Sequence, residues 1–314
     1  MENQSKIRKD LFTPLSEEEK NIKASVRPSV GYWKDAWMRL KKDKLALVSL
    51  IVIIVVILAA IFIPKFSQYD YAANDLTATY LIPSGEHWFG TDNLGRDIFV
   101  RIFYGARYSL AIAVLAAFIN LVIGVIYGGI AGFFGGKVDT MLMRTVDVIA
   151  SIPLTIYVII FMAMLSKPGS SGSGLLTIVL ALSISYWIGM ARIVRGDVLQ
   201  LKQQEFVLAA KSLGASKSRI LMRHLIPNCM GSIMVTLTLL IPEAVFTEAF
   251  LSFLGLGIAA PKASLGTLAN EAMRGIYSYP YQLLFPSAMI CIIILAFNLF
   301  GDGLSQALDP KNKR

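Results

Sequence analysis

The sequence predicts an all-α integral membrane protein that crosses the membrane six times. Of its 314 residues, 55% are apolar and only 16% are charged, whereas a soluble chain of this size carries about 25% charged residues. The mean hydropathy is +0.60, and the apolar residues gather in runs of about 20, the length of helix that crosses a hydrocarbon core. This composition excludes an ordinary soluble enzyme.

Six apolar segments are the predicted membrane spans. The first runs from Leu45 to Ile63 without a charged residue, and Pro64 is expected to end it. It begins too far from the N-terminus to be a cleaved secretory leader, so we expect it to remain as an anchor. The other predicted spans are residues 109–134, 141–165, 175–193, 225–256 and 281–308.

The distribution of Lys and Arg predicts that both termini are cytoplasmic. Eleven of these residues precede the first span, and seven more lie between Arg192 and Arg223. With both ends inside, the cytoplasmic segments hold 23 Lys and Arg against 7 on the other side, which is the bias that orients membrane helices. Topology therefore accounts for the net charge of +9, and no nucleic-acid partner is expected.

The segments outside the spans complete the predicted organisation. Trp33, Trp37 and Leu40 recur at helical spacing and predict a short helix lying on the inner surface of the lipid bilayer. The predicted divisions are a cytoplasmic N-terminal segment (1–44), the first span (45–64), an extracellular loop (65–108), a five-helix core (109–308) with a cytoplasmic loop (194–224), and a cytoplasmic tail (309–314).

Small residues mark one face of the second span. Asn120, Gly124, Gly128 and Gly132 recur every fourth residue. This spacing places them together on the helix, where the missing side chains allow another helix to approach closely. Ordinary bundle packing and a moving seam are both compatible with the pattern.

The cytoplasmic loop carries a helix–turn–helix pattern. Phe206, Ala209, Ala210 and Leu213 form an apolar stripe at helical spacing. Gly214 can adopt the left-handed conformation that ends a helix, and a serine at position 216 is a good cap for the next one. An exposed docking element of this kind suggests a subunit driven by a separate soluble partner. A basic loop that only sets the topology would explain the lysines but not this design.

No catalytic site can be assembled from the sequence. Gly169 and Gly174 have the first spacing of a phosphate-binding P-loop, but Leu175 stands where a lysine is required. The two histidines, His87 and His224, are predicted on opposite sides of the membrane and cannot share a metal or a triad. We therefore expect a chain that is not an enzyme and needs no cofactor or metal.

Acidic residues within the predicted spans are candidates for function, because charge at membrane depth is costly. Asp147 follows Arg144 by three residues, so we expect a structural ion pair on one helix face. Glu243 and Glu248 are candidates for the transport pathway or a gate. A buried hydrogen-bonded packing role stays open for Glu243, and Glu248 is expected nearer the outer surface, in contact with water.

The loop resembles the cytoplasmic motif of binding-protein-dependent ABC importer permeases. Ala209-Ala210-x3-Gly214 and the later Pro227 match that motif in spacing, although Leu208 replaces its Glu and His224 its Ile. Other segments are similar to the C-type permease subunit of oligopeptide and dipeptide importers, from about Trp33 to the C-terminus. These segments are residues 89–97, 105–110, 144–153, 224–228, 248–257 and 301–310.

The resemblance implies the fold, the partners and the coupling residues. The fold would be the type I ABC importer permease architecture. The partners would be a homologous second permease subunit forming a heterodimer, two cytoplasmic ATPase subunits and an extracellular peptide-binding protein, at a bacterial cell membrane. The residues that would dock on the ATPase are Glu205, Ala209, Ala210, Leu213, Gly214, Ala215 and Ser216.

Within this family several substrates remain open from the sequence. Oligopeptides are the expected cargo, and importers of dipeptides, nickel or glutathione share the motifs. A stand-alone secondary transporter or channel is the alternative from a different class. Such a protein would work without ATP or partner subunits, whereas this chain would be inert alone.

Overall fold

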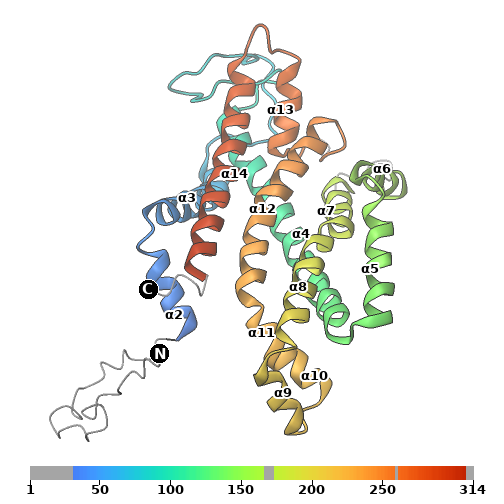
Figure 1. Cartoon of the computed structure of the whole chain (residues 1–314). Coiled ribbons are helices and arrows are strands. Elements are labelled where there is room, and N and C mark those ends of the chain that lie inside the picture. Colours follow the sequence, from blue (N-terminus) through green and yellow to red (C-terminus); the bar gives the residue numbers. More distant parts are fainter. Residues whose placement is uncertain (1–30, 166–172, 259–260, 309–314) are drawn as a thin grey trace, which may run out of the picture.

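The computed structural model describes residues 31–165, 173–258 and 261–308. Within these ranges the chain is built of helices, with one isolated β-bridge between Thr91 and Asp97. Five helical segments are long and apolar enough to cross a membrane, or six if a bent pair of helices counts as one span. The predicted all-α membrane fold is therefore confirmed (Figure 1).

The N-terminal part of the described chain is two helices at a sharp turn. Helix α2 (Tyr32–Leu40) is the short helix that the tryptophan spacing predicts. Asp43 caps α3 (Lys44–Phe66) by accepting hydrogen bonds from the N–H groups of its first turn. The expectation that Pro64 ends this span is wrong by two residues. A proline in a last turn removes only the bond to the carbonyl four residues earlier, so the helix continues to Phe66.

The next helix is longer than its apolar segment suggests. Helix α4 (Ile98–Phe134) has 37 residues, because Asp97 caps it well before the predicted start at residue 109. Arg101 and Arg107 lower the hydropathy of its first turns and hide them from a search for apolar runs. The predicted loop 65–108 is correspondingly shorter, and the α3–α4 connection is residues 67–97.

The predicted third span is broken. Helices α5 (Gly136–Ala150) and α6 (Leu154–Leu165) are bent by 76° at the residues between them. Pro153 explains the break, since a proline disfavours the helical conformation of the residue before it and cannot donate a backbone hydrogen bond.

The second half of the bundle follows the predicted spans more closely. Helices α7 (Ser173–Ser185) and α8 (Trp187–Leu201) together form one 28-residue candidate span, and α14 (Tyr281–Leu308) has the predicted bounds. The remaining elements are α9 (Glu205–Ser212), α10 (Lys217–Arg219), the π-helix η2 (Ile220–Leu225), α11 (Ile226–Asn228), α12 (Met230–Phe253) and α13 (Leu265–Met273).

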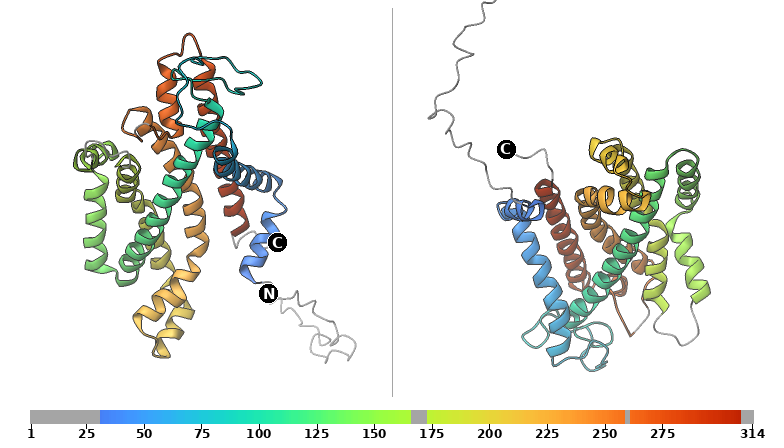
Figure 2. Two further views of the ribbon diagram at one scale, coloured as in Figure 1. Left: turned by 180° about the vertical axis from the view of Figure 1, so that it is seen from behind. Right: turned by 90° about the horizontal axis from the view of Figure 1, so that it is seen from below.

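Helix α4 runs through the centre of the bundle and packs on α3, α7, α8 and α12 (Figures 1 and 2). Its small-residue face contacts α8. A side chain at Gly124 would meet the Met190 side chain at 2.6 Å, and one at Gly132 would meet the Arg195 carbonyl at 2.7 Å. The glycines are therefore required by close packing. Helices α9 and α10 project at one end of the molecule, and α13 lies with the α3–α4 connection at the other.

Candidate coupling loop, buried acids and polar network

The predicted helix–glycine–helix element is present in the loop that joins α8 to α12. Helix α9 ends at Ser212, and Gly214 has a φ of +77°, a conformation that residues with side chains rarely adopt. The Oγ atom of Ser216 then accepts a hydrogen bond from the backbone N–H of Arg219 at 3.3 Å and caps α10. The turn is closed by a bond from the N–H of Ala215 to the carbonyl of Ala210 at 3.1 Å.

The predicted apolar stripe divides between two surfaces. Phe206 and Leu213 are 40% and 88% exposed, and Ala209 is also exposed. Ala210 instead packs beside Val207, which is buried against Ile220, Leu225 and Cys229. Val207 was not part of the predicted stripe, and it is the residue that seats the loop on its own chain. The loop therefore presents Phe206, Ala209 and Leu213 outward from a fixed base.

The loop connects to α12 through a distorted helix. The π-helix η2 follows α10 directly and leads through α11, where Pro227 lies in the first turn, into α12. The amide of Asn228 donates to the carbonyl of His224 at 2.6 Å across this junction. From Lys217 to Phe253 only Cys229 interrupts the helical assignment, so α10 leads into α12 with almost no break. Single π-turns of this kind occur frequently at functional sites.

Asp147 is paired, but not with the residue expected from the sequence. Its Oδ1 atom accepts a hydrogen bond from Nη2 of Arg192 on α8 at 3.0 Å, and both side chains are more than half exposed. The predicted pair with Arg144 is not among the ion pairs of the described residues. Asp147 thus pairs with Arg192 from a second helix instead of with Arg144 on its own helix, and this ion pair links α5 to α8.

Glu248 is fully buried, so the expectation that water surrounds it is wrong. Its Oε2 atom lies 2.6 Å from Oγ of Ser109 on α4, and its Oε1 atom lies 2.7 Å from Oγ of Ser252. The hydroxyl of Ser109 also accepts the N–H of Leu265, the first residue of α13, at 3.3 Å. Glu248 therefore joins α4, α12 and the start of α13. This geometry favours a positioning role over contact with a transported molecule.

Glu243 lies on a different face of the same helix. Its side chain is exposed, as are those of Leu239, Phe246 and Phe250, which share its face at helical spacing. The part of the chain that the structure describes leaves this face of α12 exposed. Glu243 is therefore not buried by the described part of its own chain, and a buried packing role would require a second subunit against this face.

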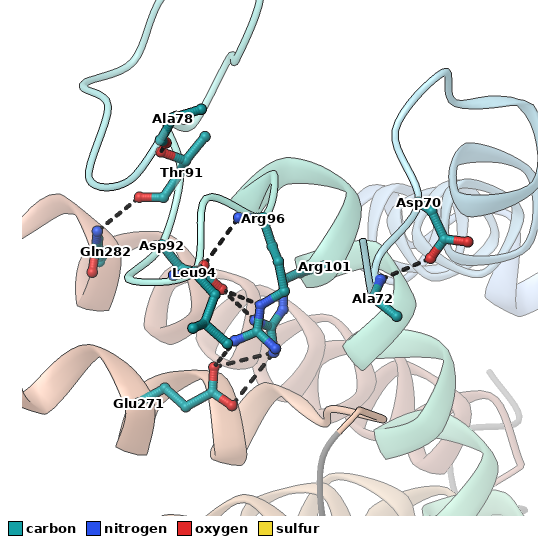
Figure 3. A network of polar contacts seen from close by, with 10 residues as sticks. All are labelled: Asp70, Ala72, Ala78, Thr91, Asp92, Leu94, Arg96, Arg101, Glu271 and Gln282. Atoms are coloured by element: carbon teal, nitrogen blue, oxygen red, sulfur yellow. Dashed lines mark hydrogen bonds and ion pairs between the residues drawn. The ribbon is translucent and has the colours of Figure 1, made fainter. Parts of the chain in front are cut away.

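A network of charged side chains fastens the α3–α4 connection to α13 (Figure 3). Asp92 accepts hydrogen bonds from Nε of Arg96 at 2.7 Å and from Nη1 of Arg101. Glu271 on α13 accepts hydrogen bonds from Nη2 of Arg96 at 3.1 Å and from Nη2 of Arg101 at 3.4 Å. Arg101 has a side-chain exposure of only 2%. Two buried arginines thus bridge a loop carboxylate and a helix carboxylate.

Further contacts hold the connection in place. Nδ1 of His87 lies 2.8 Å from Oδ2 of Asp97, the residue that caps α4. The amide of Gln282 on α14 donates to the carbonyl of Thr91 at 2.9 Å. Hydrogen bonds from the hydroxyl and the N–H of Thr77 hold the pKa of the Asp75 carboxyl below its usual value. The connection is therefore a folded cap on the ends of α4, α13 and α14.

The sequence did not identify this network as a site. Asp92, Arg96 and Asp97 stand in a segment noted for its resemblance, and Arg101 was counted only as a charge. The available signal was the alternation of acidic and basic residues beside a membrane span, where unpaired charge is costly. Glu271 is 170 residues further along the chain, so no sequence spacing could pair it with Arg101.

The comparisons with known proteins agree with this architecture. Residues 124–314 match the family model described as binding-protein-dependent transport system inner membrane component. Residues 31–83 match the N-terminal TM domain of oligopeptide transport permease C. A multi-pass helical chain with these two matches is a membrane permease. It belongs to the family of binding-protein-dependent transport system inner membrane components, the non-catalytic membrane subunits of ABC importers.

Individual relatives cover nearly the whole chain. The chain is 50% identical to the oligopeptide transport system permease protein OppC of Bacillus subtilis, over 98% of this chain and 99% of that protein. It is 46% identical to the dipeptide transport system permease protein DppC of the same species, over 100% of this chain and 96% of that protein. The glutathione transport system permease protein GsiD of Escherichia coli is 41% identical, over 90% of this chain and 91% of that protein.

Solved structures support the fold. The MetNI methionine ABC transporter in inward-facing conformations matches with a TM-score of 0.56 and 19% identity, over 67% of this chain and 96% of that chain. An amino acid ABC transporter matches with a TM-score of 0.51 and 19% identity, over 65% of this chain and 92% of that chain. The type I ABC importer permease architecture is thereby confirmed for the matched core.

Proposed function

We propose that this chain is the permease subunit of an ATP-driven importer of oligopeptides and forms half of its translocation pathway. The 50% identity to an oligopeptide permease along almost the full length of both chains carries this proposal. Dipeptides are the second candidate cargo, because the identity to a dipeptide permease is only slightly lower. The identity to a glutathione permease keeps glutathione as a third.

The other half of the pathway would be a homologous permease subunit. The exposed face of α12 with Leu239, Glu243, Phe246 and Phe250 supports this, because a carboxylate facing lipid is expensive. A second subunit against this face would place Glu243 at the interface or on the pathway. Glu248 would keep α12 and α13 in position behind it.

ATP would act on this chain through the loop between α8 and α12. Its outward residues Phe206, Ala209 and Leu213 would dock in a cleft of one of two ATPase subunits, and Glu205, Gly214, Ala215 and Ser216 would shape that surface. The seat formed by Val207 and the almost unbroken helical path through η2 would carry the motion of the ATPase to α12. The chain itself supplies no nucleotide chemistry.

The bacterial relatives support a placement in a bacterial cell membrane, and the excess of Lys and Arg in the segments expected inside supports cytoplasmic termini. The loop of α9 and α10 would then be cytoplasmic, and the α3–α4 connection with α13 would face outward, toward an extracellular peptide-binding protein. Figure 1 shows the two regions at opposite ends of the molecule, as this placement requires.

Reconstituted transport tests the proposal. The chain is combined in proteoliposomes with its second permease, ATPase and binding-protein partners, and uptake of a labelled pentapeptide is measured with and without ATP. Competition by unlabelled dipeptide, glutathione or oligopeptide then ranks the substrates. We expect ATP-dependent uptake that oligopeptide inhibits best. Uptake by this chain alone, without ATP or partners, would instead identify a secondary transporter or channel.

A further inference from the structure

A cavity of about 730 Å³ lies between α2, the turn that follows it, and the last turns of α14. Three basic side chains line it, from Arg39, Lys41 and Lys42. Gly303 and Gln306 on α14 form part of the opposite wall. A cavity of this size is large enough for a small-molecule group, since ligand sites commonly enclose about 300–1,000 Å³.

The acidic residues at this cavity are already engaged. Asp35 accepts a hydrogen bond from Nη2 of Arg39 at 2.7 Å. Asp43 caps α3, accepting from the N–H groups of Leu45 at 2.9 Å and Ala46 at 3.2 Å. Among the described residues, neither Lys41 nor Lys42 takes part in an ion pair. The three basic and two acidic side chains of the lining leave a net charge of +1, and the two lysines supply the positive groups that no carboxylate pairs with.

The walls of the cavity are fixed by close packing. Leu40, Ala46 and Ala307 are buried together where α2, α3 and α14 meet. A side chain at Gly303 would clash with Ala46, so the glycine allows α14 to lie against the start of α3. The right-hand view of Figure 2 shows α2 crossing the start of α3 at a large angle. The two lysines are exposed, but the backbone that carries them is held in place by the packing of α2, α3 and α14.

The cavity also lies at the ends of two candidate membrane spans, which is where lipid headgroups are expected. Its lining includes Asp43, which caps α3, and Gly303, Gln306 and Ala307 near the end of α14, and these two helices are candidate membrane spans. Trp33 and Trp37 on α2 are 54% and 46% exposed, and tryptophan concentrates at membrane–water interfaces. Nζ of Lys41 lies 5.2 Å from the ring centroid of Trp37, so charge and aromatic surface are adjacent.

We propose that this cavity binds the headgroup of an anionic phospholipid. Lys41 and Lys42 would hold the phosphodiester, and Gln306 would face it from α14. The acyl chains would lie along the exposed apolar residues Leu45 and Val48 at the start of α3. Basic pockets between membrane helices recognise anionic headgroups by this chemistry. The lipid would bind α2 to α14 and stabilise the N-terminal part of the bundle. This inference does not depend on the transported substrate.

The test is lipid binding by the full-length chain purified with its permease partner. Native mass spectrometry compares the affinity for phosphatidylglycerol with that for phosphatidylcholine of the same acyl chains. In K41Q/K42Q we expect roughly thirtyfold weaker binding of phosphatidylglycerol, because each basic residue near an anionic surface adds a factor of about five. Gln306→Trp should also weaken binding, since it fills the cavity without changing its charge.

The matched control is K34Q/K44Q, which removes two exposed lysines that do not line the cavity. We expect it to weaken binding by a much smaller factor. Equal losses in the two double variants would show diffuse surface attraction and overturn the proposal. Equal affinity for phosphatidylcholine, unchanged binding in Q306W, or displacement of phosphatidylglycerol by an equal concentration of inorganic phosphate would each overturn it as well. Thermal unfolding without added lipid checks that every variant folds.

Discussion

Glu248 and Ser109 meet at 2.6 Å in the interior of the bundle, where a carboxyl group of α12 and a hydroxyl of α4 satisfy each other away from water. Oγ of Ser109 also accepts a hydrogen bond from the backbone N–H of Leu265, the first residue of α13. The other end of α13 is held to α4 by the contact between Glu271 and Arg101. Helix α13 is therefore attached to α4 near both of its ends.

Replacement of Glu248 by alanine is expected to destabilise the chain. The hydroxyls of Ser109 and Ser252 would lose their partner inside the protein, at a cost of about 1–3 kcal/mol for each buried polar group left unsatisfied. Glu248→Gln keeps two polar atoms in place and should cost less. The measurement is the thermal unfolding midpoint in detergent. Glu243→Ala, on the exposed face of the same helix, is the control. Equal midpoints for E248A and E243A would contradict the assigned role.

Replacement of Arg101 by alanine should loosen the α3–α4 connection. Asp92 and Glu271 would keep only Arg96 between them. Removing one partner of a buried ion pair costs about 3–5 kcal/mol, and we expect about 2 kcal/mol here because Arg96 still pairs with both carboxylates, although one negative charge is left uncompensated. Hydrogen exchange in residues 67–97 measures the effect. The exposed Arg107 supplies the control variant R107A. Unchanged hydrogen exchange in R101A would show that Arg101 does not hold the α3–α4 connection in place.

Replacement of Gly214 by valine should uncouple transport from ATP. The φ of +77° at this position is strained for any other residue, with a cost of about 1–3 kcal/mol. The turn between α9 and α10 would shift, while the membrane helices would remain intact. Peptide uptake and co-purification of the ATPase are measured together. Gly196→Val is the control, because Gly196 lies within α8 with open space at its Cβ and no positive φ. Wild-type uptake in G214V would exclude this loop as the coupling element.

The docking surface of the loop can be tested separately from its backbone. Leu213 is 88% exposed, and Leu213→Asp would place a charge in the cleft proposed to hold it. We expect weaker ATPase binding with an unchanged unfolding midpoint. Val207→Asp would show the opposite pattern, because Val207 is buried in the seat of the loop and its charge would destabilise the chain itself. Full ATPase retention by L213D would argue against docking through this face.

A cysteine at position 243 tests the interface of α12. In the chain alone Glu243→Cys should react with a lipid-soluble maleimide, because the side chain is exposed. Co-expression of the second permease should suppress that reaction by about tenfold or more. Both variants carry Cys291→Ser, because the native Cys291 is exposed and would itself react. Ala113→Cys, at a fully buried position, should then react in neither sample. Labelling that is unaffected by the second permease would place this face of α12 against lipid.

Local sequence determined the features that depend on near neighbours in the chain. Runs of apolar residues decide which segments leave water, so the all-α membrane fold and the bounds of α14 followed from hydropathy. The turn at Gly214 and the cap at Ser216 also followed, because a left-handed glycine and a capping hydroxyl act within a few residues. The family resemblance rested on motifs of the same local kind.

Only the tertiary structure decided which distant side chains meet. Asp147 pairs with Arg192 and not with Arg144, since two helices crossing in space offer partners that spacing along one helix does not reveal. Glu248 is buried because Ser109 and the start of α13 close over it. The first turns of α4 were missed because their arginines lower the hydropathy, and those charges are acceptable only where Asp92 and Glu271 neutralise them. Burial and pairing are set by packing between helices, which a linear pattern does not encode.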